Sequence, residues 1–124
     1  MPNAKTVLIV EDEALLGTNL RDFLARRGWD ARLARTGSLA VQTVALFAPA
    51  VILLDFQLPD MDGFQALDAI RHRHPACGCV LMTARPLELV AEGSRQRGIS
   101  RILSKPFSLS AMEGSLLTEM AAAG

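Results

Sequence analysis

A chain of 124 residues has the length of one compact domain, and half of its residues are hydrophobic. Its 13 basic and 13 acidic residues give a formal net charge of zero, so charge offers no reason to expect binding to nucleic acid or to an acidic membrane. The apolar run at residues 7–10 is too short for a signal peptide or a membrane span, and we expect a soluble, cytoplasmic protein.

Short apolar runs alternate with longer segments whose apolar residues recur at helical spacing, which is typical of parallel strands joined by crossover helices. The first run predicts a strand at 6–10, followed by a helix at 13–27 that Gly28 ends. We expect this helix to bury an apolar face made of Leu15, Leu16, Leu20, Phe23 and Leu24.

The alternation continues along the rest of the chain. A weaker strand at 30–34 and a helix at 37–47 precede the strongly apolar run 51–54, which we expect to be the central strand. The turn 55–63 follows this run. The remaining predicted elements are a helix at 64–72, a strand at 79–82, a helix at 86–97, a strand at 101–103 and a helix at 108–122, with Ser108 or Ser110 as N-cap.

Five strands and five helices in this order predict an α/β fold. Because crossovers between parallel strands are right-handed almost without exception, the chain has few ways to wind. We expect a doubly wound five-stranded parallel sheet in the order 2-1-3-4-5, with helices on both faces. Residues 1–124 are predicted to form a single domain.

The two cysteines lie close together, in Cys77-Gly78-Cys79, with only His72 and His74 nearby. This composition gives weak support to a zinc or redox site. We expect Cys79 to enter a buried strand and Cys77 to lie in the preceding loop as an exposed thiol. Neither cysteine is assigned a function.

Polar residues are concentrated immediately after the predicted strands. They are Glu11 and Asp12 after the first strand, Asp55 after the third, Thr83 after the fourth and Lys105 after the fifth. In open α/β sheets the functional crevice lies beyond the carboxyl ends of the strands. The five side chains are therefore predicted to meet at one edge of the sheet.

Three carboxylates at one edge would repel one another by about 4 kcal/mol per pair at ~4 Å and an effective dielectric of 20. Such a cluster requires a cation or the uptake of a proton. Mg2+ suits it, because this ion takes carboxylate, water and phosphate oxygens as ligands. It would neutralise charge as a phosphoryl group arrives at Asp55, while Thr83 and Lys105 hold the phosphoryl oxygens.

Four segments combine these residues with their neighbours: Val7-Leu-Ile-Val-Glu-Asp-Glu, Leu54-Asp-Phe-Gln-Leu-Pro-Asp-Met-Asp-Gly-Phe, Met82-Thr-Ala and Leu103-Ser-Lys-Pro-Phe. In order, spacing and placement at strand ends they resemble the receiver domain of two-component response regulators, over essentially the whole chain. The resemblance implies a flavodoxin-like fold and a phosphorylated signalling domain rather than an enzyme.

The resemblance also implies roles for individual residues. Asp55 is the expected phosphoacceptor, and Thr83 and Lys105 are expected to bind the phosphoryl group. The implied Mg2+ ligands are Glu11, Asp12, Asp55 and the backbone carbonyl of Gln57. A cis peptide bond is expected before Pro106.

The implied phosphodonor is a sensor histidine kinase or a histidine phosphotransfer protein, which is expected to dock near the first helix. Phosphorylation is expected to change the face formed by the fourth helix, fifth strand and fifth helix, which would bind an unknown downstream protein or effector domain. We expect no direct contact with nucleic acid or membrane. Phosphorylation-dependent homodimerisation stays open, as does the choice between a stand-alone protein and part of a longer regulator.

One position departs from the family pattern. The family commonly has an aromatic residue three positions before the lysine, and here that position is Ile102. The alternative function is therefore a protein-interaction module that keeps the fold but works without phosphorylation. An aspartyl phosphohydrolase is disfavoured because Asp55-Phe-Gln lacks the expected Asp-x-Asp pair. Asp60 and Asp62 are interpreted as turn carboxylates.

Overall fold

The computed structural model, which describes residues 4–123, contains five parallel strands in the order β2-β1-β3-β4-β5. The strands are β1 Thr6–Val10, β2 Asp30–Ala34, β3 Val51–Asp55, β4 Gly78–Thr83 and β5 Arg101–Ser104. The helices are α1 Ala14–Arg26, α2 Gly37–Leu46, α3 Gly63–Arg73, α4 Leu87–Gln96 and α5 Leu109–Ala123. The predicted fold class, element order and central position of β3 are confirmed.

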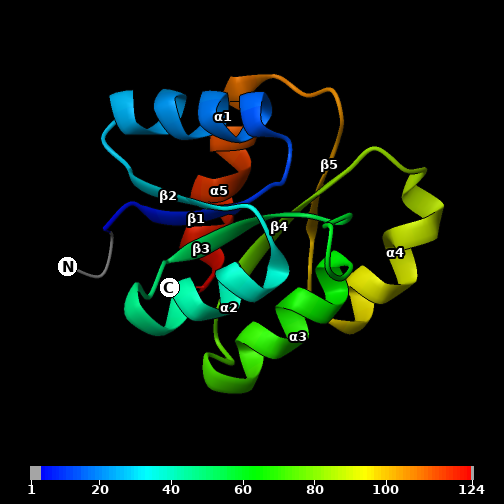
Figure 1. The fold of residues 1–124 in the computed structure, drawn as a ribbon. Helices are drawn as coiled ribbons and strands as arrows, with labels where there is room; N and C mark the ends of the chain where they lie inside the picture. The colour runs from blue at the N-terminus through cyan, green and yellow to red at the C-terminus, as the bar shows by residue number, and fades with distance from the viewer. Residues whose placement is uncertain (1–3, 124) are drawn as a thin grey trace.

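Helices cover both faces of the sheet, with α1 and α5 on one side and α2, α3 and α4 on the other (Figure 1). This arrangement explains why β3 is apolar at four successive positions. Val51 and Leu53 belong to the core shared with α1 and α5, whereas Ile52 and Leu54 belong to the core on the opposite face. Among residues 4–123, no helix combines the length and apolarity needed to cross a membrane.

The ends of several helices follow from local sequence signals. Gly28, after α1, and Gly98, after α4, have φ values of +92° and +68°, which glycine adopts without steric cost. Helix α3 begins with a capping box in which Asp62 and Gln65 each accept a hydrogen bond from the other's backbone amide. Ser108 is the residue that caps α5, because its Oγ accepts from the amide of Ala111 at 3.1 Å.

Two sequence predictions about burial were wrong. Leu15 was expected in the core, but its side chain lies on the first turn of α1 and the residue is 68% exposed. Cys77 was expected as an exposed thiol, but it is buried next to the start of β4. Burial raises the pKa of the Cys77 thiol to about 11, which disfavours the reactive thiolate.

A buried carboxylate joins α5 to the turn between α1 and β2. Glu113 is 6% exposed, and it accepts hydrogen bonds from Nε1 of Trp29 at 3.0 Å and from Nε of Arg27 at 2.5 Å. Burial on its own would raise the pKa of Glu113, but these two hydrogen bonds outweigh burial and hold the pKa below its ordinary value. The Glu113 carboxylate therefore stabilises the folded state in its ionised form.

We predict that Glu113→Ala lowers the free energy of unfolding by about 1–3 kcal/mol, because the buried indole N–H of Trp29 loses its acceptor. Urea denaturation at neutral pH measures this change. Glu88→Ala, at an exposed position of α4, is the control, with an expected change within about 0.5 kcal/mol. Equal effects of the two substitutions would contradict the assigned role of Glu113.

The pH dependence of the free energy of unfolding provides a second test of the role of Glu113. A carboxylate whose pKa is lowered by folding contributes stability above its unfolded pKa and loses that contribution as the pH falls through its folded pKa. The stability difference between wild type and Glu113→Gln should therefore shrink below about pH 4.3, the ordinary pKa of a glutamate. A difference that stays constant from pH 7 to pH 3 would count against the hydrogen-bonded carboxylate.

Candidate functional site

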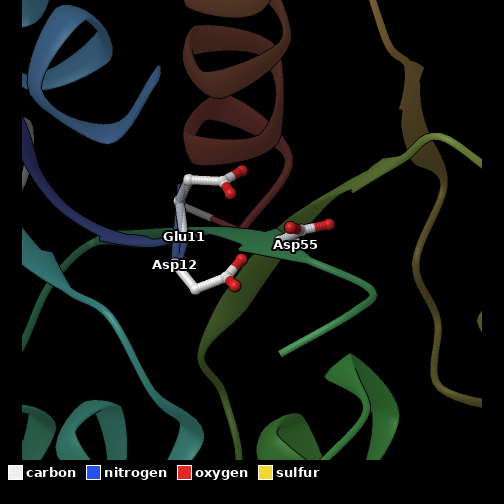
Figure 2. A group of neighbouring side chains, drawn as sticks. All are labelled: Glu11, Asp12 and Asp55. Carbon is white, nitrogen blue, oxygen red and sulfur yellow. The ribbon is translucent and has the colours of Figure 1, made fainter. Parts of the chain in front are cut away.

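Three carboxylates meet where β1 and β3 end. Val10 pairs with Leu54 across these neighbouring parallel strands, so the residues that follow, Glu11 and Asp55, reach the same edge of the sheet. Figure 2 shows their side chains and that of Asp12 grouped at this edge. One oxygen from each carboxylate lies within 4.8 Å of the other two.

Lys105 places a single ammonium group between two of these carboxylates. Its Nζ donates to Oε1 of Glu11 at 2.7 Å and to Oδ2 of Asp55 at 3.2 Å. Both acids are nearly inaccessible, at 1% exposure for Glu11 and 5% for Asp55, whereas Asp12 is exposed. The ammonium therefore compensates two buried negative charges and leaves a net negative site.

The pKa values of Glu11 and Lys105 reflect this burial and their hydrogen bond to each other. Desolvation, reinforced by the charge of Asp55, raises the pKa of Glu11, although the hydrogen bond from Lys105 acts in the opposite direction. Partial burial would lower the pKa of Lys105, but its bond to Glu11 and the charge of Asp55 raise that pKa above its ordinary value. Lys105 is thus held as a cation beside Asp55.

The segment after β3 turns sharply beside Asp55. Oδ1 of Asp55 accepts a long hydrogen bond of 3.3 Å from the amide of Gln57. A side chain at Gly63 would place its Cβ 2.8 Å from the carbonyl oxygen of Asp55, so this close approach requires glycine. Gln57 and Ala84 join the three acids and Lys105 around an open pocket of about 400 Å3.

Thr83 ends β4 next to this group, but its hydroxyl is engaged elsewhere. The Oγ1 atom accepts a hydrogen bond of 2.9 Å from the amide of Arg85, at the start of the segment that leads to α4. The carbonyl of Thr83 accepts from the amide of Lys105 at 2.8 Å, and the Lys105–Pro106 peptide bond is cis, as the resemblance implied. The edge therefore brings together the side chains of Glu11, Asp12, Asp55 and Lys105, whereas the Thr83 hydroxyl is bonded to its own loop.

The donor set fits a hard divalent cation. Mg2+ is bound by oxygen ligands at about 2.0–2.1 Å, so two oxygens on opposite sides of the ion lie about 4.2 Å apart. At most one pair among three ligands can be opposite, and neighbouring oxygens lie about 2.9 Å apart, so the three carboxylate oxygens, now within 4.8 Å of one another, would have to move closer together around an ion. Three carboxylates against one ammonium also leave charge for a cation to neutralise.

One carboxylate near this edge was not assigned from the sequence. Asp60, interpreted as a turn residue, accepts hydrogen bonds from the amides of Gly37 and Ser38 at the start of α2. The partners are 23 and 22 residues away along the chain, so no local pattern indicates the contact.

The sequence of the chain is similar to those of known proteins. The family model for the response regulator receiver domain matches residues 7–116. The probable transcriptional regulatory protein TcrX of Mycobacterium tuberculosis is 33% identical over 104 residues, which cover 84% of this chain and 44% of that protein. The chain thus spans less than half the length of this relative.

Two solved structures are similar over nearly the whole chain. The signal receiver domain of a LuxO repressor protein from Vibrio parahaemolyticus has a TM-score of 0.87 at 26% identity, covering 97% of this chain and 92% of that one. The receiver domain of the sensor histidine kinase PA1611 from Pseudomonas aeruginosa has a TM-score of 0.84 at 27% identity, covering 95% and 98%. The latter structure is described with a magnesium ion coordinated in its active site cleft.

We predict that Asp12→Asn stabilises the protein in the absence of divalent cations, because it removes one of the three clustered negative charges. Mg2+ at ten times its Kd should raise the free energy of unfolding of wild type by about 1.4 kcal/mol. The same Mg2+ concentration should stabilise the variant far less. Denaturation with and without Mg2+ measures both effects, and Asp22→Asn, on α1 and outside the carboxylate cluster, serves as the control. Equal gains for all three proteins would exclude Asp12 as a ligand.

Proposed function

The chain belongs to the response regulator receiver domain family, and from this premise we propose that Asp55 accepts a phosphoryl group from a phosphohistidine donor. The observation that carries the proposal is the position of the Asp55 carboxylate. It is grouped with Glu11 and Asp12 and lies 3.2 Å from the ammonium of Lys105. A nucleophilic oxygen, a cation and a set of hard oxygen ligands are thus present at one point.

In the proposed transfer, an oxygen of Asp55 forms a bond to phosphorus as the phosphorus–nitrogen bond of the donor breaks. The electron pair of that bond stays on the imidazole nitrogen, so a ring that already carries a proton on its other nitrogen leaves as neutral imidazole, and Asp55 becomes an acyl phosphate. Lys105 is already beside Asp55, and its ammonium would pair with the new phosphoryl oxygens.

The proposed cofactor is Mg2+, held by the side chains of Glu11, Asp12 and Asp55 and by the backbone carbonyl of Gln57. When bound, the ion supplies positive charge against the phosphoryl oxygens. Under this proposal the chain is a signalling domain that assists its own phosphorylation and dephosphorylation, and residues 1–124 form one such domain.

Thr83 offers a route from the phosphoryl group to α4. Phosphorylation adds close to two negative charges and strong acceptor oxygens, which would draw the Thr83 hydroxyl inward. This rotation of the Thr83 side chain would break the hydrogen bond that its hydroxyl accepts from the amide of Arg85. Arg85 lies just before α4, which begins at Leu87 without a side-chain N-cap. We propose that this loss changes the face formed by α4, β5 and α5.

Ile102 is compatible with this route. Its side chain is half-buried and packs against the core that includes Val90 of α4 and Ile99. The proposed switch therefore depends on the backbone of the segment between β4 and α4 rather than on the movement of an aromatic ring in β5.

The proposed phosphodonor is a cytoplasmic sensor histidine kinase or histidine phosphotransfer protein. An apolar pocket of about 320 Å3 lies between α1 and the segment after β5, directly beside Lys105. It is lined by Leu16, Leu20, Lys105, Pro106, Phe107 and Leu109. Such a pocket suits an apolar side chain from a helix of the donor, and the downstream protein or effector domain would bind the face formed by α4, β5 and α5.

We predict that wild-type protein incubated with a small phosphodonor and Mg2+ gains the mass of one phosphoryl group, measured by intact-mass spectrometry. Asp55→Asn should gain nothing, because it lacks the acceptor carboxylate, and excess chelator should prevent the gain in wild type. If wild type binds Mg2+ but stays unmodified, even with histidine kinases as donors, the phosphate-independent interaction module becomes the better assignment.

A second prediction separates phosphoryl transfer from switching. Thr83→Ala should still be phosphorylated, because Asp55 and Lys105 remain, but phosphorylation should no longer alter hydrogen exchange at the start of α4. Thr83→Ser keeps the hydroxyl and should preserve the change. An undiminished change in phosphorylated Thr83→Ala would eliminate the route through Arg85.

A further inference from the structure

The segment between β3 and α3, residues 56–62, is closed by its own backbone. The amide of Leu58 donates to the carbonyl of Met61 at 3.2 Å, and the amide of Gly63 donates to the carbonyl of Phe56 at 2.6 Å. Gln57 and Asp62 additionally form an isolated antiparallel bridge. This β3–α3 loop is therefore a tight turn that connects rigidly to Asp55 at one end and to α3 at the other.

Asp60 attaches the loop to α2. Its Oδ1 accepts from the amide of Gly37 at 2.8 Å and its Oδ2 from the amide of Ser38 at 2.9 Å. These amides belong to the first turn of α2, where backbone N–H groups have no partner within the helix and favour negative charge. The amides of Ser38 and Gly37 accordingly lower the pKa of Asp60, which keeps the carboxylate ionised.

The contact between loop and helix is also close in packing. A Cβ at Gly37 would lie 2.5 Å from Sδ of Met61, so any larger residue at position 37 would have to displace the flexible Met61 side chain from the first turn of α2. Thr36 already supplies the ordinary N-cap of α2, with its Oγ1 accepting from Leu39 at 3.0 Å. Asp60 is thus an additional anchor supplied by another segment of the chain.

The start of α2 is tied to the opposite side of the carboxylate cluster as well. The amide of Glu11 donates to the carbonyl of Ala34 at 3.0 Å, and Ala34 ends β2 three residues before Gly37. The β1 side of the cluster, with Glu11 and Asp12, and the β3 side, with Asp55 and Gln57, are therefore both fixed relative to the first turn of α2.

We propose that Asp60 is a positioning residue of the metal site: it fixes the β3–α3 loop to α2 and thereby holds Asp55 and Gln57 at the separation from Glu11 and Asp12 that one divalent cation requires. Asp60 contributes no ligand itself. The inference rests on the proposed function, since it assigns a role relative to the Mg2+ site described there.

The test is Mg2+ binding to folded, metal-free protein, measured by isothermal titration calorimetry well below the unfolding temperature. Asp60→Ala should weaken Mg2+ binding about tenfold, the lower end of the effect expected when a group supporting metal ligands is removed. Asp60→Asn keeps one acceptor oxygen and should lose less. Thr36→Ala is the matched control, because it removes a cap of the same helix without touching the loop, and its affinity should stay within about twofold of wild type.

Hydrogen exchange of the metal-free proteins gives a readout independent of the ion. In Asp60→Ala, the amides of Leu58 and Gly63 should exchange faster than in wild type, whereas Thr36→Ala should leave them unchanged. Circular dichroism tests whether each variant is folded. If Asp60→Ala is unfolded, the Mg2+ affinity of Asp60→Asn decides: an affinity below that of wild type supports the inference, and wild-type affinity contradicts it.

The outcomes separate the inference from its premise. Wild-type affinity in both Asp60 variants, or equal losses in Asp60→Ala and Thr36→Ala, would overturn the positioning role and leave the proposed function intact. A wild-type protein that binds no Mg2+ and gains no phosphoryl group on Asp55 would overturn the proposed function, and the role of Asp60 with it.

Discussion

The edge of the sheet depends on one ammonium group shared by two buried carboxylates. Parallel strands deliver Glu11 and Asp55 to the same place, where each is almost fully removed from water. Burying two such charges without a counter-charge would cost more free energy than the net stability of a small domain. Lys105, which follows the carboxyl end of β5, compensates both charges. Because Asp12 adds a third charge that Lys105 does not contact, the edge stays attractive to a further cation.

Most of this arrangement could be predicted because it follows from the geometry of a parallel sheet. Apolar runs of four or five residues mark strands buried on both faces, and Gly28 and Gly98 end helices through their positive φ angles. Once the strands are placed, their carboxyl ends must share one edge, so the polar residue after each strand is assigned to the site without any structure. The predicted side chains at Glu11, Asp12, Asp55 and Lys105 do lie together there.

The features that sequence reasoning missed are contacts between segments that are distant along the chain. Asp60 has the composition of a turn residue, and only the folded structure shows that its carboxylate meets the first turn of α2. Trp29 and Glu113 are 84 residues apart, so their hydrogen bond leaves no trace in local periodicity. Periodicity also overstated the core at Leu15, because at 100° per residue this side chain lies on the side of α1 opposite the buried residues Gly17, Leu20 and Leu24.

The two halves of α4 are held by different kinds of contact, and this bears on how the domain would transmit a change. Near its C-terminal end the ring of Phe64 occupies the space that a side chain at Gly93 would need, and the Arg97 guanidinium stacks 4.5 Å above that ring. Arg97 also makes two hydrogen bonds of 2.9 Å to Asp68, so this end is fastened to α3.

At the other end, Pro86 offers no side-chain cap, Leu87 and Leu89 are exposed, and the preceding segment is held by the bond between Thr83 and Arg85. A change at Thr83 would therefore act on the weakly fastened end while α3 holds the other. Under the proposed switch an aromatic residue at position 102 would not be required for coupling, because α4 begins within two residues of Arg85, the hydrogen-bond partner of Thr83.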